Sequence, residues 1–130
     1  MLRFCAMILG TVILWLCAAG ISCSANDPSE AYVKYLATLE SAKSIKDISS
    51  CLSSARLKEL DMQDREKAFK EMKSRAPVDL FIVNRIPDGK DMRLIVVGKE
   101  KLTKKECKGS VTMVLENGYW KIGREFYQSK

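Results

Sequence analysis

The C-terminal part of the chain contains an Asn-Gly pair between two stretches in which apolar and polar residues alternate. A two-residue type I′ turn needs a positive φ angle at both central positions, and Asn-Gly adopts this turn readily. Asn117 and Gly118 therefore predict a β-hairpin between residues 107–116 and 119–127. The apolar residues that share one face of this hairpin are Val111, Met113 and Leu115 on the first strand and Trp120, Ile122 and Phe126 on the second.

Two segments upstream of the hairpin also alternate with a period of two. Residues 79–85 and 92–97 flank a Pro-Asp-Gly-Lys turn, and a lysine-rich segment at 99–105 leads into the hairpin. Consecutive strands joined by short connections favour an antiparallel meander. We therefore expect four antiparallel strands.

The residues before the sheet follow helical spacing. Asp27 and Pro28 predict a helix start, and Tyr32, Leu36 and Leu39 recur at i, i+4 and i+7. A shorter helical pattern covers 45–52, and a third begins near 61–64 and ends before the proline at 77. The predicted fold class is α+β, with N-terminal helices packed on a curved four-stranded antiparallel sheet in a single domain at 26–130.

The first 25 residues have the pattern of a secretory signal peptide or a lipoprotein leader. Arg3 precedes an uncharged run from Phe4 to Ile21, and small residues follow. Cleavage after Ala25 would release a soluble domain. Alternatively, the segment Gly20-Ile21-Ser22-Cys23 resembles a bacterial lipoprotein cleavage box, which makes Cys23 a lipidation candidate. The uncharged run is also near the lower limit for an uncleaved membrane anchor.

All three outcomes predict an extracytoplasmic domain in a bacterial cell envelope, either periplasmic, membrane-anchored or secreted, because Arg3 stays on the inner side of the membrane. Oxidising compartments favour disulfides, and Cys51 and Cys107 are the two cysteines outside the leader. We expect them to form a bridge that closes a loop of about 57 residues and contributes about 4 kcal/mol. Two buried free thiols are the alternative.

The chain contains no histidine, which excludes histidine bases, histidine triads and histidine metal ligands. We expect no cofactor. The net charge is +6, and lysines concentrate around the 99–105 turn. These lysines keep a sheet edge soluble, or Lys101, Lys104 and Lys105 contact anionic lipid or glycan. No aromatic residues interleave with them, so nucleic acid is not an expected partner.

Helices followed by a sheet that ends in Glu116-Asn117-Gly118-Tyr119-Trp120-Lys121-Ile122 resemble the nuclear transport factor two-like, cystatin-like α+β cone superfamily, including its small bacterial envelope proteins of unknown function. The resemblance implies a cone-shaped sheet. Superfamily enzymes, the ketosteroid isomerases and dehydratases, need a carboxylate base and an oxyanion donor inside the cone. In an unbroken strand, Tyr119 and Tyr127 lie opposite Trp120, so we assign no catalytic residue.

Arg124 has the same parity as Trp120 and Phe126, so an unbroken strand would point it inward as the polar group of a ligand pocket. A bulge at Gly123 would turn it outward instead. We expect a non-enzymatic binding or structural module that binds an unknown protein or a small apolar ligand and reaches the membrane through its leader or lipid anchor. The alternatives are a cone-type enzyme or small-ligand binder with a pocket near Trp120, Arg124 and Phe126, and lysine-mediated association with anionic lipid or glycan.

Overall fold

The computed structural model describes residues 26–130, so the predictions for the leader and for Cys23 lie outside the described residues. The helical half contains α2 (Pro28–Ser41), the short 3-10 turns η2 (Ile45–Asp47) and η3 (Ser49–Cys51), α3 (Ser54–Asp61) and α4 (Arg65–Arg75). The strands are β1 (Val78–Asp88), β2 (Asp91–Lys99), β3 (Glu106–Glu116) and β4 (Tyr119–Ser129). Within this part of the chain, no helix has the length and apolar character needed to cross a membrane.

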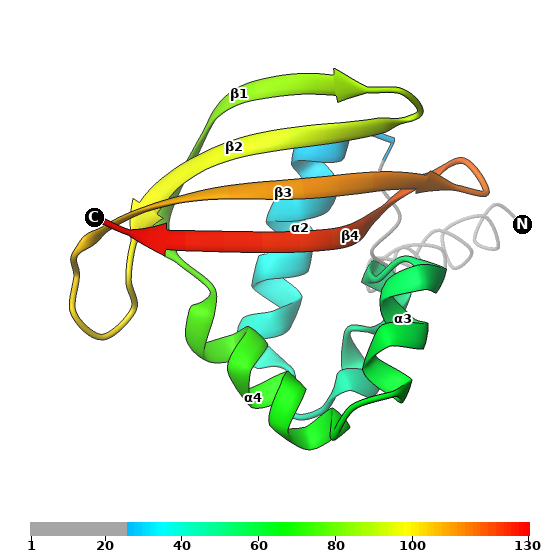
Figure 1. Cartoon of the computed structure of the whole chain (residues 1–130), viewed down its shortest axis with the longest axis horizontal. Helices are drawn as coiled ribbons and strands as arrows, with labels where there is room; N and C mark the ends of the chain where they lie inside the picture. Colours follow the sequence, from blue (N-terminus) through cyan, green and yellow to red (C-terminus); the bar gives the residue numbers. More distant parts are fainter. Residues whose placement is uncertain (1–25) are drawn as a thin grey trace, which may run out of the picture.

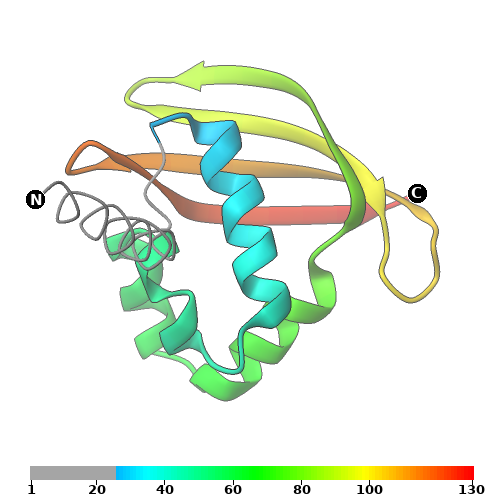
Figure 2. The ribbon, with the colours of Figure 1, turned by 180° about the vertical axis from the view of Figure 1, so that it is seen from behind.

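The strands form one antiparallel sheet in the order β1-β2-β3-β4. Helix α2 crosses one face of the sheet, and α3 and α4 lie on that same side near the β4 edge (Figures 1 and 2). Within residues 26–130, the opposite face carries no helix. The prediction of N-terminal helices on a four-stranded antiparallel sheet is therefore confirmed. The cone shape is not confirmed, because the sheet is open and has β1 and β4 as its edges.

Side-chain caps determine where the helices begin. The Asp27 carboxylate accepts a hydrogen bond from the Glu30 backbone N–H at 3.0 Å, as the sequence predicted. Helix α3 was not predicted, because the serine-rich segment before it is a poor helix former. The Ser53 hydroxyl caps this helix by accepting from the Arg56 N–H at 3.1 Å. A serine that is unfavourable inside a helix is thus used at the helix start.

Helix α4 depends on a similar cap, since the Asp64 carboxylate accepts hydrogen bonds from the N–H groups of Glu66 and Lys67 at 3.1 and 3.2 Å. We expect Asp64→Ala to lower the free energy of unfolding by about 1 kcal/mol, because two N–H groups lose their acceptor. Urea denaturation followed by circular dichroism measures this change. Lys67→Ala, on the same helix, is the control. Equal stability of the two variants would contradict the prediction.

The core lies between α2 and the inner face of the sheet. Its fully buried side chains are Tyr32, Tyr35 and Leu39 from α2, Leu94 and Val96 from β2, Val111 and Met113 from β3, and Ile122 from β4. Leu115 was expected on the same buried face but is 48% exposed, because it lies at the hairpin end of the sheet. The face of β3 is otherwise as predicted.

A β-bulge in β4 changes the expected face of every later residue. Met113 pairs with Ile122 and Thr112 pairs with Arg124, so Gly123 has no partner of its own. One extra residue reverses which face the following side chains point to. A Cβ atom at position 123 would lie 2.8 Å from Val114 Cγ2, so a larger residue there would have to displace this methyl group.

The prediction that Arg124 and Phe126 share the inner face with Trp120 is therefore wrong. The Arg124 side chain is 81% exposed, and Phe126 is 63% exposed. Glu125 and Tyr127 take the inner positions instead. The bulge at Gly123, which was the alternative interpretation, is the arrangement that the structure has.

Candidate functional site

A hydrogen-bonded network of three tyrosines and one glutamate links α2 to the end of β4. The Tyr35 hydroxyl donates to Glu125 Oε1 at 2.5 Å, and the Tyr127 hydroxyl donates to Glu125 Oε2 at 2.9 Å. The Tyr32 and Tyr127 hydroxyl oxygens are 2.6 Å apart. Because a phenol has one hydrogen and that of Tyr127 goes to Glu125, Tyr32 is the donor to Tyr127. Both carboxylate oxygens are thus held in place by the protein.

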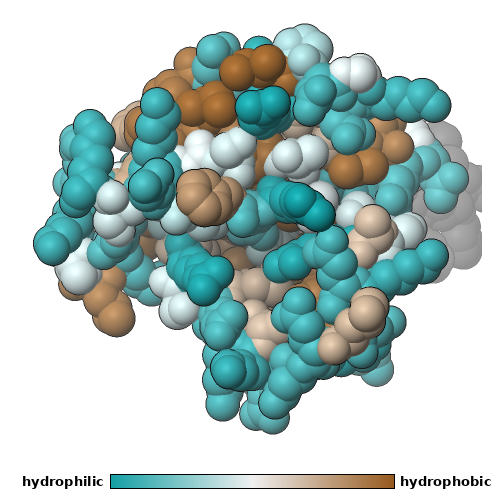
Figure 3. Space-filling model, in the orientation of Figure 1, coloured by the Kyte–Doolittle hydropathy of each residue, from teal (hydrophilic) through white to brown (hydrophobic). Residues whose placement is uncertain are grey.

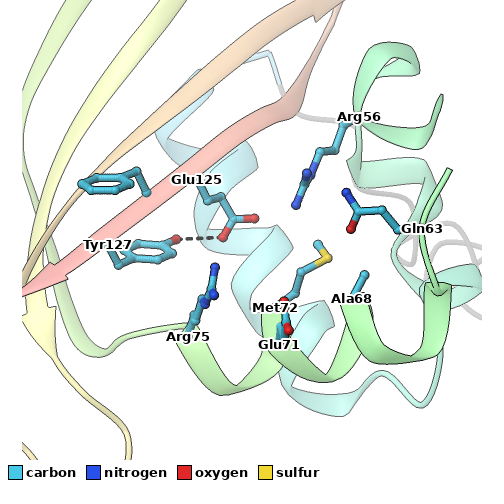
Figure 4. Close-up of a pocket in the computed structure, with 9 residues that line it drawn as sticks. Arg56, Gln63, Ala68, Glu71, Met72, Arg75, Glu125 and Tyr127 are labelled. Atoms are coloured by element: carbon cyan, nitrogen blue, oxygen red, sulfur yellow. Dashed lines mark hydrogen bonds between the residues drawn. The ribbon is translucent and has the colours of Figure 1, made fainter. Parts of the chain in front are cut away.

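The environment of Glu125 favours its neutral form. Although the residue is partly exposed at the sheet edge, its carboxylate lies under the sheet (Figure 4). Burial raises the pKa of this carboxyl, and the hydrogen bonds from Tyr35 and Tyr127 and the charge of Arg56 oppose the rise. Burial and the nearby Glu125 also raise the pKa values of Tyr35 and Tyr127, which keeps both phenols protonated as donors.

A cavity of about 430 Å³ lies between this network and the helices α3 and α4; we call it the β4 pocket (Figure 4). It is lined by Arg56, Gln63, Ala68, Glu71, Met72, Arg75, Glu125, Phe126 and Tyr127. The corresponding region between the sheet and the helices has mostly hydrophilic side chains around it (Figure 3). The β4 pocket therefore combines a polar interior with a smaller apolar wall.

Arg56 has a buried donor without a matching acceptor. Its side chain extends from α3 into the β4 pocket toward Glu125 (Figure 4). One of its terminal nitrogens bonds Glu59 Oε2 at 3.2 Å, but the buried Nε has no hydrogen-bond partner among the described residues. Leaving a buried donor unpaired costs about 1–3 kcal/mol, so such groups call for an explanation. An acceptor supplied by a ligand is one explanation.

A second guanidinium reaches the same space from α4. Arg75 points toward Glu125 and Tyr127 (Figure 4), and it forms no ion pair within the described part of the chain. Gln63 adds an amide, whereas Met72 and Ala68 supply apolar surface. Glu71 is exposed, so its carboxylate has access to water. The groups closest to Glu125 are mainly hydrogen-bond donors, which suits a ligand rich in acceptor oxygens.

The structure does not bring Trp120, Arg124 and Phe126 together in one pocket. Trp120 donates its indole N–H to the Asn26 carbonyl at 3.1 Å and so fixes the start of the described chain. Arg124 forms an exposed ion pair with Glu59 at 3.6 Å. Phe126 lines the edge of the β4 pocket. The sequence interpretation missed Arg56, Glu125 and the inward position of Tyr127. If the alternation of faces along the strand is counted again after a bulge at Gly123, Glu125 and Tyr127 are placed correctly on the inner face.

Cys107 is a buried free thiol, so the predicted bridge between Cys51 and Cys107 is not formed. Cys51 is next to Leu52, which bridges Ile122 near the middle of the sheet, whereas Cys107 pairs with Ser129 at the far end of β4. The two cysteines therefore lie at different positions along β4. Burial raises the pKa of the Cys107 thiol, which keeps it protonated.

The lysines of the β2–β3 connection are not equivalent. Lys101 donates through Nζ to the Lys73 carbonyl at 3.0 Å and ties this connection to α4. Lys104 and Lys105 are exposed.

In residues 26–130, no three His, Cys, Asp or Glu side chains are grouped so as to hold a metal ion.

Comparisons with known proteins give the fold but no family. No family model matches the chain, and no curated protein matches it. The chain is similar to the solution structure of a SEC-C motif containing protein from Rhodopseudomonas palustris, with 12% identity, 85% of this chain and 84% of that chain covered, and a TM-score of 0.53. At this identity, the likeness shows the fold alone.

This match corrects the resemblance drawn from the sequence. The structural neighbour is described as a SEC-C motif protein, and no matching family model supports the nuclear transport factor two-like superfamily. The hairpin segment at 116–122 that suggested that superfamily is a common feature of antiparallel sheets. Its Asn-Gly turn and its alternation reflect β-hairpin geometry rather than membership of one family.

Proposed function

We propose that this chain is an extracytoplasmic binding module that binds a carboxylate-bearing ligand in the β4 pocket. The observation that carries the proposal is the buried Nε of Arg56, which has no hydrogen-bond partner among residues 26–130, on a side chain that lines a cavity next to Glu125. A ligand carboxylate would supply the acceptor that this donor lacks. Guanidinium–carboxylate hydrogen bonds are among the stronger ones in proteins, because both groups are charged and planar.

The other groups of the β4 pocket fit the same ligand. Glu125, whose pKa is raised, can donate its proton to a ligand oxygen when it is neutral, and Arg75 adds a second positive charge. Met72 and Ala68 can pack against an apolar body attached to the carboxylate. The proposed ligand is therefore an organic acid with an apolar part rather than a purely apolar molecule.

The cellular location in this proposal comes from the leader pattern. Mass spectrometry of the mature N-terminus tests it: an N-terminus at Asn26 would indicate cleavage and exclude lipidation at Cys23, whereas a lipid mass on Cys23 would establish an anchor. Retention of the intact leader would indicate an uncleaved membrane anchor. Ligand binding in the β4 pocket does not depend on which of these occurs.

The ligand proposal is tested with benzoate as the probe, since it joins a carboxylate to a small apolar ring. We expect Arg56→Met to weaken benzoate binding at least about ten-fold, because a hydrogen bond to a charged group contributes about 1.5–3 kcal/mol. Chemical-shift titration of the backbone amides measures the affinity.

Arg124→Met is the matched control, because Arg124 also pairs with Glu59 but lies outside the β4 pocket. Benzamide, which has the same ring without the charge, should bind weakly to all three proteins. Equal benzoate affinity in the wild type and Arg56→Met would contradict the proposal.

The same pocket gives a second candidate function, a proton-transfer enzyme. A carboxyl with a raised pKa that faces a ligand cavity is suited to act as a general acid or base. Turnover of a bound carbonyl compound that is lost in Glu125→Gln, with binding retained, would support it. We place binding first because both oxygens of Glu125 already accept structural hydrogen bonds from tyrosines.

A further inference from the structure

Strand β4 is an edge of the sheet, and among the described residues only its first part has a partner on the outer side. Leu52 bridges Ile122 in parallel orientation, and the Ser53 N–H donates to the Ile122 carbonyl at 2.9 Å. After Ile122 this short segment leaves the edge and enters α3. The edge of β4 thus already accepts an extended segment, but within residues 26–130 the stretch from Glu125 to Ser129 has no strand on its outer side.

The direction of the free backbone groups follows from the pairing with β3. The Lys130 N–H donates to the Glu106 carbonyl at 3.1 Å, and residues of an antiparallel edge strand point their hydrogen-bonding groups alternately toward and away from their neighbour. Phe126 and Gln128 therefore bond to β3. The residues between them, Glu125, Tyr127 and Ser129, direct their N–H and C=O groups outward, away from the sheet.

The two edges of the sheet differ in a way that favours strand addition at β4. Strand β1 contains Pro87, two register shifts and a positive φ angle at Asp79. Proline and irregular pairing are common means of preventing edge-to-edge association. Past the bulge at Gly123, β4 contains none of these features.

A groove follows this free edge. The β4 pocket shares Arg75 and Tyr127 with a second cavity of about 230 Å³, which continues to Ser129 and to Leu102 in the β2–β3 connection. Helix α4 forms the wall opposite the strand along both cavities. A long groove beside a strand edge suits an extended chain better than it suits a compact molecule.

We infer that the natural ligand is an extended peptide that adds as a fifth strand beside residues 125–129 of β4 and places an acidic side chain between Arg56 and Arg75. This inference rests on the proposed function and specifies its ligand. Backbone hydrogen bonds to Glu125, Tyr127 and Ser129 would supply much of the affinity, and the guanidinium groups would select the acidic residue. Side chains along a strand alternate, so every second residue of the peptide would face the groove.

Amide hydrogen exchange of the mature chain tests this inference, with the peptide acetyl-Thr-Val-Glu-Val-Thr-amide as the probe. Saturating peptide should slow exchange at the amides of Glu125, Tyr127 and Ser129 at least about ten-fold, since these N–H groups become hydrogen-bonded. The amides of Phe126 and Gln128 should change little, because they already bond to β3. Benzoate should shift resonances in the β4 pocket without producing this alternating protection.

Modified peptides make the test specific to backbone pairing. N-methylation on the amides that face β4 should abolish binding, whereas N-methylation on the alternate amides should leave it within about two-fold. Replacing the central glutamate of the peptide by glutamine should remove the sensitivity to Arg56→Met.

The outcomes separate this inference from the proposed function. If benzoate binding depends on Arg56 but the peptide fails to bind at millimolar concentration, or binds without alternating protection, the inference is overturned and the proposed function stands. If neither benzoate nor the peptide responds to Arg56→Met, both are overturned. Alternating protection together with dependence on Arg56 supports both.

Discussion

Gly109→Ala is expected to lower the free energy of unfolding by about 3 kcal/mol, the largest effect that we predict for a single methyl group in this chain. Gly109 is buried on the inner face of β3, directly opposite Tyr127. A Cβ atom there would lie 2.4 Å from Tyr127 Cδ1 and 2.8 Å from the Phe126 carbonyl oxygen. The ring must move, and its hydroxyl then leaves Glu125 and Tyr32.

Urea denaturation measures this loss, and the neighbouring Ser110→Ala on the outer face serves as the control. Combining Gly109→Ala with Tyr127→Leu should destabilise less than the sum of the two single variants, because the leucine lacks the ring that clashes. Additive effects of the two substitutions would show that the ring contact is not the cause. The close approach of Tyr127 to the Gly109 backbone would then need another explanation.

Tyr35→Phe is expected to lower the free energy of unfolding by about 2 kcal/mol near neutral pH. The substitution keeps the buried ring and removes the hydroxyl that donates to Glu125 Oε1 at 2.5 Å. A hydrogen bond contributes about 0.5–1.5 kcal/mol to a neutral acceptor and about 1.5–3 kcal/mol to a charged one, and its loss leaves the buried carboxyl group of Glu125 with one donor fewer. Tyr119→Phe, at an exposed hairpin position, is the control and should have little effect.

The effect of Tyr35→Phe should depend on pH. The pKa of Glu125 is raised in the folded state, so the folded protein holds its proton more strongly than the unfolded chain does. The resulting contribution to stability is complete below the unfolded pKa of 4.5 and is lost as the pH rises through the folded value. Removing a donor that stabilises the carboxylate raises the pKa of Glu125 in the folded state further. The unfolding free energy of Tyr35→Phe should therefore decrease over a wider range of pH than that of the wild type.

Glu125→Gln provides the reference for this measurement, since it cannot titrate at that position. The unfolding free energy of the wild type minus that of Glu125→Gln should decrease as the pH rises above 4.5. The unfolding free energy of Tyr35→Phe minus that of Glu125→Gln should decrease more. Denaturation series from pH 4 to about pH 9 give both curves. Parallel curves for the three proteins would show that Glu125 keeps an ordinary pKa.

The sequence determined the secondary structure and its order through local rules. The cap at Asp27, the helical spacing of Tyr32 and Leu39, the alternation of the strands and the Asn117-Gly118 turn each act over a few neighbouring residues. These features were sufficient to predict helices on a four-stranded antiparallel sheet. They were not sufficient for helix α3, whose weak local preference is overcome by packing and by the cap at Ser53.

The candidate site was decided by tertiary structure. Alternation predicts the face of a residue only while the pairing is regular. Because of the bulge at Gly123, the inner face carries Glu125 and Tyr127 in place of the predicted Arg124 and Phe126. Whether two cysteines meet likewise depends on where the helical segment contacts the sheet. Cys51 precedes the residue that bridges Ile122, whereas Cys107 pairs with Ser129 at the end of β4. Local patterns in the sequence predicted the four strands and the helices α2 and α4. The unpaired Gly123 in β4 set which side chains face the β4 pocket, because a single register shift reverses every position that follows.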